Sequence, residues 1–145
     1  MGSNKISNII YPEEYNTEFI FVHYKYEDDL RSLLEESGYV QNFVKKYRKC
    51  LKFLSVLKTD CTVQGKLFEK LKHHDNLYSI KIFGQKNIRI IFQFVKRDKR
   101  TIAVLIFPFQ EKDSKQNTAT SYETAIEIAQ ERLKELLDED RKEPR

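Results

Sequence analysis

The alternation of apolar and polar side chains in residues 77–112 constrains the fold of this chain more than any other feature. Within two runs, 78–82 and 88–94, apolar residues recur at every second position, which is the period of a β-strand with one buried face. The opposite face of these two runs carries Ser79, Lys81, Arg89 and Gln93. The runs therefore predict neighbouring antiparallel strands that share one apolar and one polar face.

A third run, 101–107, follows a turn at 97–100 and is the most hydrophobic of the three. A strand that is apolar on both faces belongs inside a sheet, so we expect this one to be the central strand. Pro108 has no N–H to donate to a neighbouring strand, and it predicts either the end of the strand or an edge position. Together the three runs predict a three-stranded antiparallel meander.

Two like charges are predicted to face each other on this meander. If residues 84–86 form a three-residue loop, Lys81 lies directly opposite Arg89. Such a pair repels, so we expect a compensating group, either a bound polyanion or a carboxylate from a partner. The alternative is that both long side chains splay apart into water.

The positive charge of the chain is concentrated in its middle. Residues 41–100 contain 16 Lys or Arg and only 4 Asp or Glu, whereas residues 1–40 and 101–145 both carry a net negative charge. A basic segment of this kind indicates a face that binds nucleic acid or phosphate. Its other interpretation is the solvated surface of a lysine-rich protein.

Residues before the meander predict one further strand and a helical hairpin. Residues 18–24 are rich in aromatic and β-branched side chains and indicate a first strand. Apolar residues at three- and four-residue intervals predict a short helix over 28–38 and a longer one, with a basic flank, over 40–58. A third, brief amphipathic segment covers 63–71.

After the meander and a polar loop, Thr120 and Glu123 form a capping box that predicts a final helix. The apolar side of this helix consists of Tyr122, Ala125, Ala129, Leu133 and Leu136. The later charges have no pattern, and we expect the tail, 138–145, to fray. The length of 145 residues suits one domain, which we place at 18–137 behind an N-terminal extension, 1–17.

The cysteines and histidines do not predict a metal site. Cys50 and Cys61 lie in or beside an apolar helical pattern and lack metal-ligand or disulfide spacing, which suits thiols in a reduced compartment. His73 and His74 are adjacent, but no further ligands follow at ordinary spacing, so we prefer a solvated loop. No run is long enough to cross a membrane and the first residues lack the form of a signal peptide, so we expect a cytoplasmic protein without metal or cofactor.

The order strand, two helices, meander and final helix resembles the RelE/ParE superfamily of type II toxin–antitoxin toxins, particularly its HigB-like, phage-derived branch. The likeness covers about residues 18–137 and is carried by KLFEKLKHHDNLYSIKI, NIRIIFQF, TIAVLIFPFQEK and EIAQERLKEL. These stretches look like a helix end with the first meander strand, an arginine-bearing second strand, a third strand with a Phe-x-basic-basic motif, and the last helix. The resemblance implies an α+β, RelE-like fold. In that fold a small antiparallel sheet, made of the first strand and the meander, packs against an N-terminal helical hairpin, and a C-terminal helix follows.

The same resemblance implies an endoribonuclease that cleaves messenger RNA on the ribosome without a metal ion and is held inactive by a cognate antitoxin. In this reaction the ribose 2′-hydroxyl attacks the adjacent phosphate, and the enzyme neutralises the charge that grows on the phosphorane. By its match to the family, Arg89 would bind the scissile phosphate, while Lys81 and Lys112 match further basic positions. Glu111 stands where the family often has a lysine, so it either acts as a general base or weakens phosphate contact.

The residues expected to contact ribosomal or messenger RNA are Lys66, Lys70, Lys72, Lys86 and Gln93. Tyr122 is the only nearby candidate for the family's proton carrier, but its place on the apolar side of the last helix predicts core packing. Two alternatives to the nuclease stay open. One is a ParE-like toxin that binds DNA gyrase without cleaving RNA, and the other is a catalytically inactive RelE-fold binding protein.

Overall fold

The computed structural model describes residues 19–37, 40–72, 74, 76–84, 87–97, 99–111 and 121–142. Two of the predicted site residues, Lys86 and Lys112, lie outside these ranges. The helices of the described chain are α2 (Tyr26–Ser37), α3 (Val40–Leu57), the 3₁₀ helix η1 (Lys58–Val63) and α4 (Tyr122–Lys142). Its strands are β1 (Ile20–Val22), β2 (Phe68–Lys70), β3 (Leu77–Ile82), β4 (Ile88–Arg97) and β5 (Arg100–Gln110).

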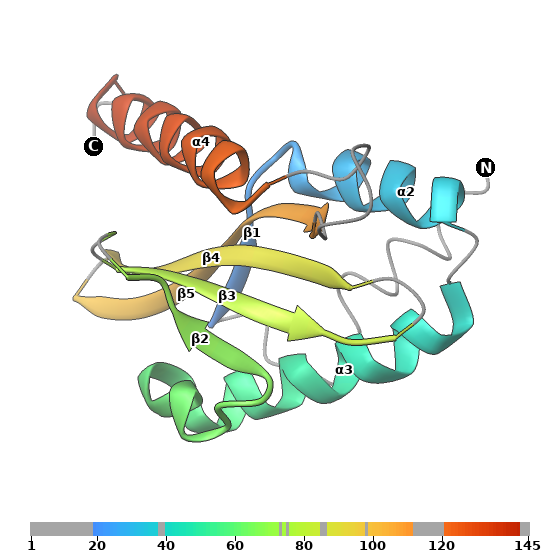
Figure 1. Cartoon of the computed structure of the whole chain (residues 1–145). Coiled ribbons are helices and arrows are strands. Elements are labelled where there is room, and N and C mark those ends of the chain that lie inside the picture. The colour runs from blue at the N-terminus through green and yellow to red at the C-terminus, as the bar shows by residue number, and fades with distance from the viewer. Residues whose placement is uncertain are drawn as a thin grey trace.

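The five strands form one mixed sheet in the order β1-β5-β4-β3-β2 (Figure 1). The predicted meander is confirmed, because β3, β4 and β5 pair antiparallel in sequence order. The prediction of an entirely antiparallel sheet is wrong, since β1 runs parallel to β5. The helices α2 and α3 carry the chain from β1 to the opposite edge of the sheet, and the meander then returns it to the side of β1. The fold is therefore α+β with a mixed sheet.

The segment 63–71 is not the amphipathic segment that its spacing suggested. Its first residues form a turn in which the N–H groups of Leu67 and Phe68 both donate to the carbonyl of Gln64. The strand β2 follows and pairs antiparallel with β3, with Phe68 buried and its two successors exposed. A three-residue strand shows too little of a period of two for the sequence to reveal it.

The central strand of the sheet is β4, not β5, because β1 adds to the outer side of β5. Pro108 does not end β5, which continues to Gln110. The prediction of an edge position is closer, since β1 pairs only with residues 103–105 of β5. The N–H of Glu111 donates to the carbonyl of Asn87 beyond the end of β4. The N–H of Glu111 therefore points toward β4. Because N–H directions alternate along a strand, the nitrogen of Pro108, three residues earlier, points away from β4, to the side where β1 does not pair with β5.

A β-bulge interrupts the pairing of β4 with β5. Ile91 pairs with Phe107 and the next residue, Phe92, pairs with Leu105, so Ile106 is the extra residue. An extra residue shifts the register by one and reverses which face each later side chain occupies. The bulge therefore decides which residues of the last part of β5 share a face with Arg89.

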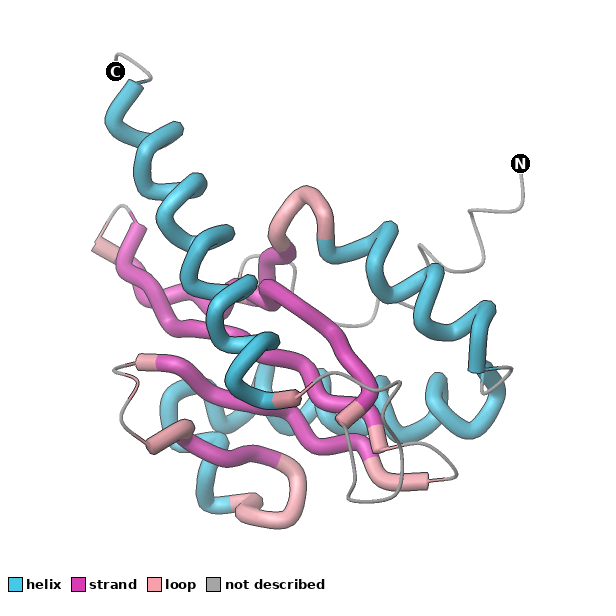
Figure 2. Tube along the Cα trace, turned by 45° about the horizontal axis from the view of Figure 1, so that its top comes forward, coloured by secondary structure: helices cyan, strands magenta, loops and turns pink. Residues whose placement is uncertain are grey.

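The sheet lies between two layers of helix (Figure 2). One face packs on α2 and α3, and its buried sheet residues include Ile80, Ile82, Ile88, Ile90 and Phe92. The other face packs on α4, and its buried residues include Leu77, Ile91, Ile102, Val104 and Ala129. The alternation predicted for the meander is thus confirmed, but the prediction of an open polar face is wrong. That face packs on α4, and its Ser79 and Arg89 are buried.

The last helix begins one residue later than the predicted capping box implies. Ser121 is the capping residue, because its Oγ accepts a hydrogen bond from the N–H of Thr124 at 3.2 Å. Thr120 lies outside the described residues. The helix runs to Lys142, so the predicted boundary at 138 does not mark its end. Among the described helices, none combines the length and apolarity needed to cross a membrane.

Candidate nucleic-acid interface

Lys81 and Arg89 occupy directly paired positions on β3 and β4, as the loop length predicted. The compensating group comes from the chain itself. The guanidinium Nη2 of Arg89 donates to Glu111 Oε1 at 2.9 Å, and the two groups form an ion pair. Glu111 follows β5 and lies on the face of Arg89 because of the bulge at Ile106, since without it Arg89 would oppose Pro108 rather than Phe109.

Arg89 is the buried member of this pair. Its side chain is 7% exposed, whereas that of Glu111 is 30% exposed. The guanidinium lies over the ring of Phe83, 4.7 Å from its centre, and Nη1 also donates to the carbonyl of Ile88 at 3.4 Å. The positive charge of Arg89 is therefore satisfied inside the protein, and the carboxylate of Glu111 is the part of the pair that reaches solvent.

Lys81 does not splay into open water. Its Nζ donates to the carbonyl of Gly65 at 2.8 Å, and its backbone N–H donates to the carbonyl of Leu67. The turn before β2 thus holds the ammonium at the edge of the sheet. This hydrogen bond uses one of the three donors of an ammonium group, and no carboxylate of the described residues forms an ion pair with it.

Tyr122 packs in the core, as its position on the apolar side of α4 predicted. Its ring meets that of Phe109 edge-on at 5.1 Å, and its hydroxyl is hydrogen-bonded to Ser79 Oγ at 3.0 Å. Burial raises the pKa of Tyr122, while the charge of Arg89 lowers the pKa and that of Glu111 raises it. Tyr122 therefore keeps its proton at neutral pH and lies within electrostatic reach of the Arg89–Glu111 pair.

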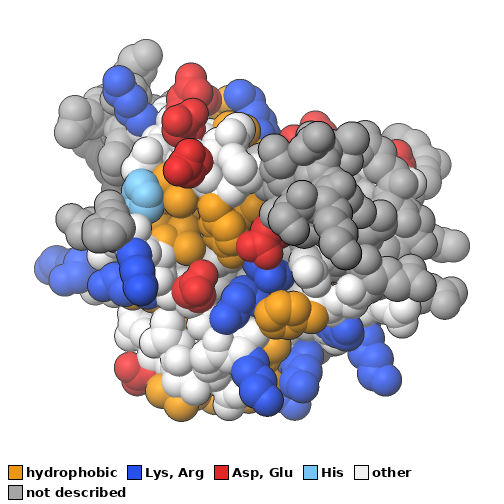
Figure 3. Space-filling view, in the orientation of Figure 1, with side chains coloured by type: hydrophobic (Ala, Val, Ile, Leu, Met, Phe, Trp, Pro, Cys, Tyr) orange, Lys and Arg blue, Asp and Glu red, His pale blue; other side chains and the backbone are white. Residues whose placement is uncertain are grey.

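A groove of about 550 Å³ lies between α3, the turn before β2 and the end of β3. Its lysines are Lys46, Lys49, Lys66 and Lys81, and its other lining residues are Cys50, Gly65, Leu67, Ile82 and Phe83. We call this site the lysine groove. In Figure 3, Lys and Arg side chains gather over α3 and the end of β3. Among the described residues, no Asp or Glu forms an ion pair with any of the four lysines.

The buried lining residues Cys50 and Ile82 form the floor of the lysine groove, which is apolar and neutral, and the exposed or half-buried lysines form its rim. Burial raises the pKa of Cys50 to about 12, so this cysteine is a thiol at neutral pH and not a nucleophile. Phe83 is 46% exposed at the rim, and the ammonium of Lys46 donates to its backbone carbonyl. The lysine groove therefore combines an apolar surface with four cationic groups.

The remaining predicted residues are divided between the lysine groove and other places. Lys66 lines the groove, whereas Lys70, on β2, and Lys72, which follows it, are exposed outside its lining. Gln93 pairs with Leu77 and Val104, four residues and about 13 Å along β4 from Arg89. The structure thus places Lys81, Arg89 and Glu111 together and leaves Gln93 apart.

Sequence reasoning did not assign Lys46, Lys49 and Phe83 to the site. The helical period of α3 indicated that the two lysines point outward, but it contains no information about which edge of the sheet they approach. Phe83 directly follows β3 and is exposed. The sequence signal that could have found it is an aromatic residue at the start of a short loop between two predicted strands.

The described residues contain no group of three or more His, Cys, Asp or Glu side chains placed to hold a metal ion. His74 is half-buried, and His73 lies outside the described residues. His23, the residue directly after β1, is fully buried, and its ring packs against that of Tyr24.

Comparisons with models of protein families, with curated proteins and with solved structures find no match for this chain. Its interpretation therefore rests on the sequence pattern and on the geometry of the site.

Proposed function

We propose that this protein is a metal-independent endoribonuclease of the RelE-like type, a toxin that cleaves messenger RNA on the ribosome and is neutralised by a cognate antitoxin. The observation that carries the proposal is the arrangement of Glu111, Arg89 and Lys81. A solvent-reaching carboxylate is fixed by a buried arginine, and the neighbouring strand carries a lysine that has no acidic partner among the described residues. Glu111 beyond β5 and Lys81 on β3 flank Arg89 of the intervening strand, and phosphodiester cleavage by a 2′-hydroxyl needs a base and a cation near the same phosphate.

In the proposed reaction, Glu111 accepts the proton of the ribose 2′-hydroxyl. The 2′-oxygen forms a bond to phosphorus while the bond from phosphorus to the 5′-oxygen breaks. The products are a 2′,3′-cyclic phosphate and a 5′-hydroxyl. The ammonium of Lys81 stabilises the negative charge on the phosphorane, because charge stabilisation of this kind is strong where water is partly excluded.

Arg89 acts in this scheme as a positioning residue rather than as the phosphate ligand that the family pattern implies. Its guanidinium is buried and donates to Glu111, so it fixes the direction of the carboxylate. Tyr122 is the candidate acid for the leaving 5′-oxygen, since burial keeps its hydroxyl protonated and both charges of the pair act on it. The resemblance of this chain to toxins with a C-terminal tyrosine supports the same role.

A specific observation also favours a second function, that of a catalytically inactive binding protein. Arg89 and Glu111 satisfy each other within the chain, as a purely structural pair would. In that case the lysine groove alone carries the function, and the protein binds RNA without cleaving it.

The two functions separate in a cleavage assay. Purified protein is incubated in EDTA with a single-stranded RNA and, in a second arm, with translating ribosomes, and the RNA ends are identified chemically. We expect new 2′,3′-cyclic phosphate ends. The Lys81→Gln variant should cleave about 100-fold more slowly. Lys96→Gln is the matched control, since Lys96 is an exposed lysine on β4 outside the lining of the lysine groove.

Intact RNA in both arms would contradict the nuclease proposal, as would equal rates for the Lys81→Gln variant and the wild type. Intact RNA together with tight RNA binding would support the binding protein. A third arm, supercoiling of a plasmid by DNA gyrase, covers the ParE-like alternative. Inhibition of supercoiling with intact RNA would replace the nuclease proposal by a gyrase-directed one.

A further inference from the structure

The lysine groove has two surfaces of different chemistry, and both fit parts of a nucleotide. Its rim carries the ammonium groups of Lys46, Lys49, Lys66 and Lys81, which suit phosphate oxygens. Its lining also includes Leu67, Ile82 and the half-exposed ring of Phe83. A volume of about 550 Å³ lies within the range of ordinary small-ligand sites.

We propose that the lysine groove binds one nucleotide of a single-stranded RNA, with its base against the apolar floor and Phe83 and its phosphates between the lysines. This inference rests on the proposed function and places the substrate on the protein. Lys81 connects the lysine groove with the proposed cleavage site, because it lines the groove and pairs with Arg89 on the adjacent strand. The nucleotide in the groove therefore lies next to the phosphate that is cleaved.

Single-stranded RNA fits the lysine groove better than a duplex does. The base edges and faces of a duplex are stacked and paired, so they do not reach an apolar floor below a rim of lysines. An unpaired base can leave the strand and lie on an aromatic or apolar surface, as it does in many single-strand binding proteins. The groove then holds one unpaired base by stacking and apolar contact, which tolerates different bases.

The neutral floor supports a base rather than a second phosphate at the bottom of the groove. Cys50 keeps its proton there, since burial raises its pKa to about 12. The four cationic groups lie at the rim, and two of them are fixed by hydrogen bonds, Lys46 to the carbonyl of Phe83 and Lys81 to that of Gly65. Fixed ammonium groups lose less side-chain entropy when a phosphate binds.

The test measures the dissociation constant of a fluorescent RNA hexamer over a range of salt concentrations. The variant Lys49→Gln with Lys66→Gln removes two charges from the lysine groove. We expect at least a tenfold weaker affinity and a salt slope reduced by about 1.4, which is about 0.7 for each lost phosphate contact on a single strand. The variant Lys96→Gln with Lys134→Gln removes the same charge from exposed positions outside the groove and should change affinity by less than about threefold.

Phe83→Leu tests the base directly. Loss of a stacking ring should weaken hexamer binding by about tenfold without changing the salt slope. Equal losses in the groove variant and the charge-matched control would overturn the proposal. Binding of a duplex of the same sequence as tightly as the single strand would also overturn it, as would binding of a mononucleotide as tightly as the hexamer.

Failure of this inference can be told from failure of the proposed function. Groove-dependent binding without any cleavage retains the nucleotide site and removes the nuclease. Cleavage that is insensitive to Lys49→Gln with Lys66→Gln retains the nuclease and removes the nucleotide site.

Discussion

Two largely buried arginines in the described part of the chain look alike and stand in different surroundings. Arg89 pairs with Glu111, and Arg132 pairs with Asp29. The arginine side chains are 7% and 11% exposed and their carboxylates 30% and 32%. Each guanidinium also lies over a phenylalanine ring, at 4.7 and 5.0 Å, and donates to a backbone carbonyl. Burial and pairing alone therefore do not distinguish a functional arginine from a structural one.

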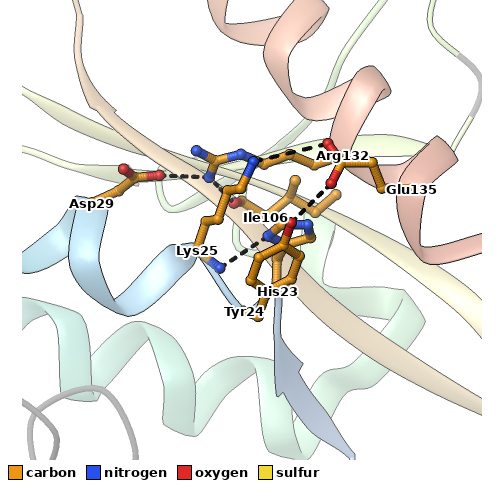
Figure 4. Close-up of polar contacts among 7 residues, drawn as sticks. All are labelled: His23, Tyr24, Lys25, Asp29, Ile106, Arg132 and Glu135. Atoms are coloured by element: carbon orange, nitrogen blue, oxygen red, sulfur yellow. Dashed lines mark hydrogen bonds and ion pairs between the residues drawn. The ribbon is translucent and has the colours of Figure 1, made fainter. Parts of the chain in front are cut away.

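The two arginines differ in what they join. Arg132 extends from α4, donates to the carbonyl of Ile106 in β5 at 3.0 Å and pairs with Asp29 of α2 (Figure 4). It connects three elements that are far apart in the sequence. Arg89 and Glu111 connect β4 with the residue that follows β5, and these strands are already held by their own ladder. We therefore expect the Arg132–Asp29 pair to contribute more to the stability of the fold than the Arg89–Glu111 pair does.

The charges around the two pairs differ as well. Beside Arg132, Glu135 accepts a hydrogen bond from the hydroxyl of Tyr24 at 2.9 Å and lies 4.0 Å from the ammonium of Lys25 (Figure 4). The charges there are balanced. The lysine groove near Arg89 has four lysines without an acidic partner in the described part of the chain. An excess of one sign of charge, rather than burial, therefore distinguishes the surroundings of Arg89 from those of Arg132, and the proposed binding site rests on this excess.

The β-bulge at Ile106 contributes to the contacts of both arginines. The bulge at Ile106 places Glu111 on the face of Arg89, and the carbonyl of the same bulged residue accepts the hydrogen bond from Arg132. A bulged residue is not part of the regular ladder, so its carbonyl is available to a side chain. The bulge therefore links the Arg132–Asp29 pair to the Arg89–Glu111 pair that we propose to be functional.

The difference between the two arginine pairs should have its largest effect on the stability of the protein. Arg132→Met should lower the free energy of unfolding by about 3 kcal/mol, because Asp29 loses its partner and α4 loses its connection to two elements. Arg89→Met should cost about half as much, since methionine can still pack on Phe83 and the ladder persists. Urea denaturation measures both. The opposite order would mean that Arg89 is the structural arginine.

The next largest effect separates packing from chemistry at Tyr122. Tyr122→Phe keeps the ring and removes the hydroxyl, so RNA cleavage should fall about 100-fold while unfolding changes by about 1 kcal/mol at most. Tyr78→Phe is the matched control, because Tyr78 packs on the opposite face of the sheet. An unchanged cleavage rate in Tyr122→Phe would leave Tyr122 as a packing residue only.

The smallest predicted effect is a pH dependence of the stability, which comes from His23 near Arg132. The Nδ1 of His23 accepts the N–H of Lys25 at 3.1 Å, and its buried Nε2 has no hydrogen-bond partner among the described residues. Burial lowers the pKa of His23 below its ordinary 6.5, and the charges of Arg132 and Lys25 lower it further. Glu135 and Asp29 raise the pKa, but they do not reverse the shift.

Because its pKa is lowered by folding, His23 binds a proton less readily in the folded protein than in the unfolded chain. Its contribution to stability is complete above pH 6.5 and is lost as the pH falls below 6.5 toward the lower folded pKa. The loss is at most about 1.4 kcal/mol per pH unit. Urea denaturation at several pH values measures it, and His23→Asn, which keeps an acceptor for Lys25, should flatten the dependence. A variant with the same slope as the wild type would assign the pH dependence to other groups.

The sequence predicted those parts of the fold that follow from local periods and loop lengths. A short loop between two alternating runs fixed the register, and Lys81 lies opposite Arg89 as expected. The partner of Arg89 was not predictable in this way. It depends on the bulge at Ile106, which no local pattern indicates, and which reverses the face that Glu111 occupies.

Long-range placement was the other part that the sequence did not reveal. Its helical period showed that α3 is basic on one flank, but the position of Lys46 and Lys49 beside β3 depends on how the helix packs across the sheet. The strand β2 has only three residues, and it forms because an unpaired edge of β3 is next to it.

The most direct test of this account compares Glu111→Gln with Asp29→Asn, two substitutions that remove the same charge from the two arginine pairs. RNA cleavage and urea denaturation are measured on both variants. We predict that Glu111→Gln lowers the cleavage rate about 100-fold or more, whereas Asp29→Asn leaves it within about twofold and has the larger effect on unfolding. Equal cleavage by the two variants, or a loss confined to Asp29→Asn, would contradict the assignment of Arg89 and Glu111 to function and of Arg132 and Asp29 to structure.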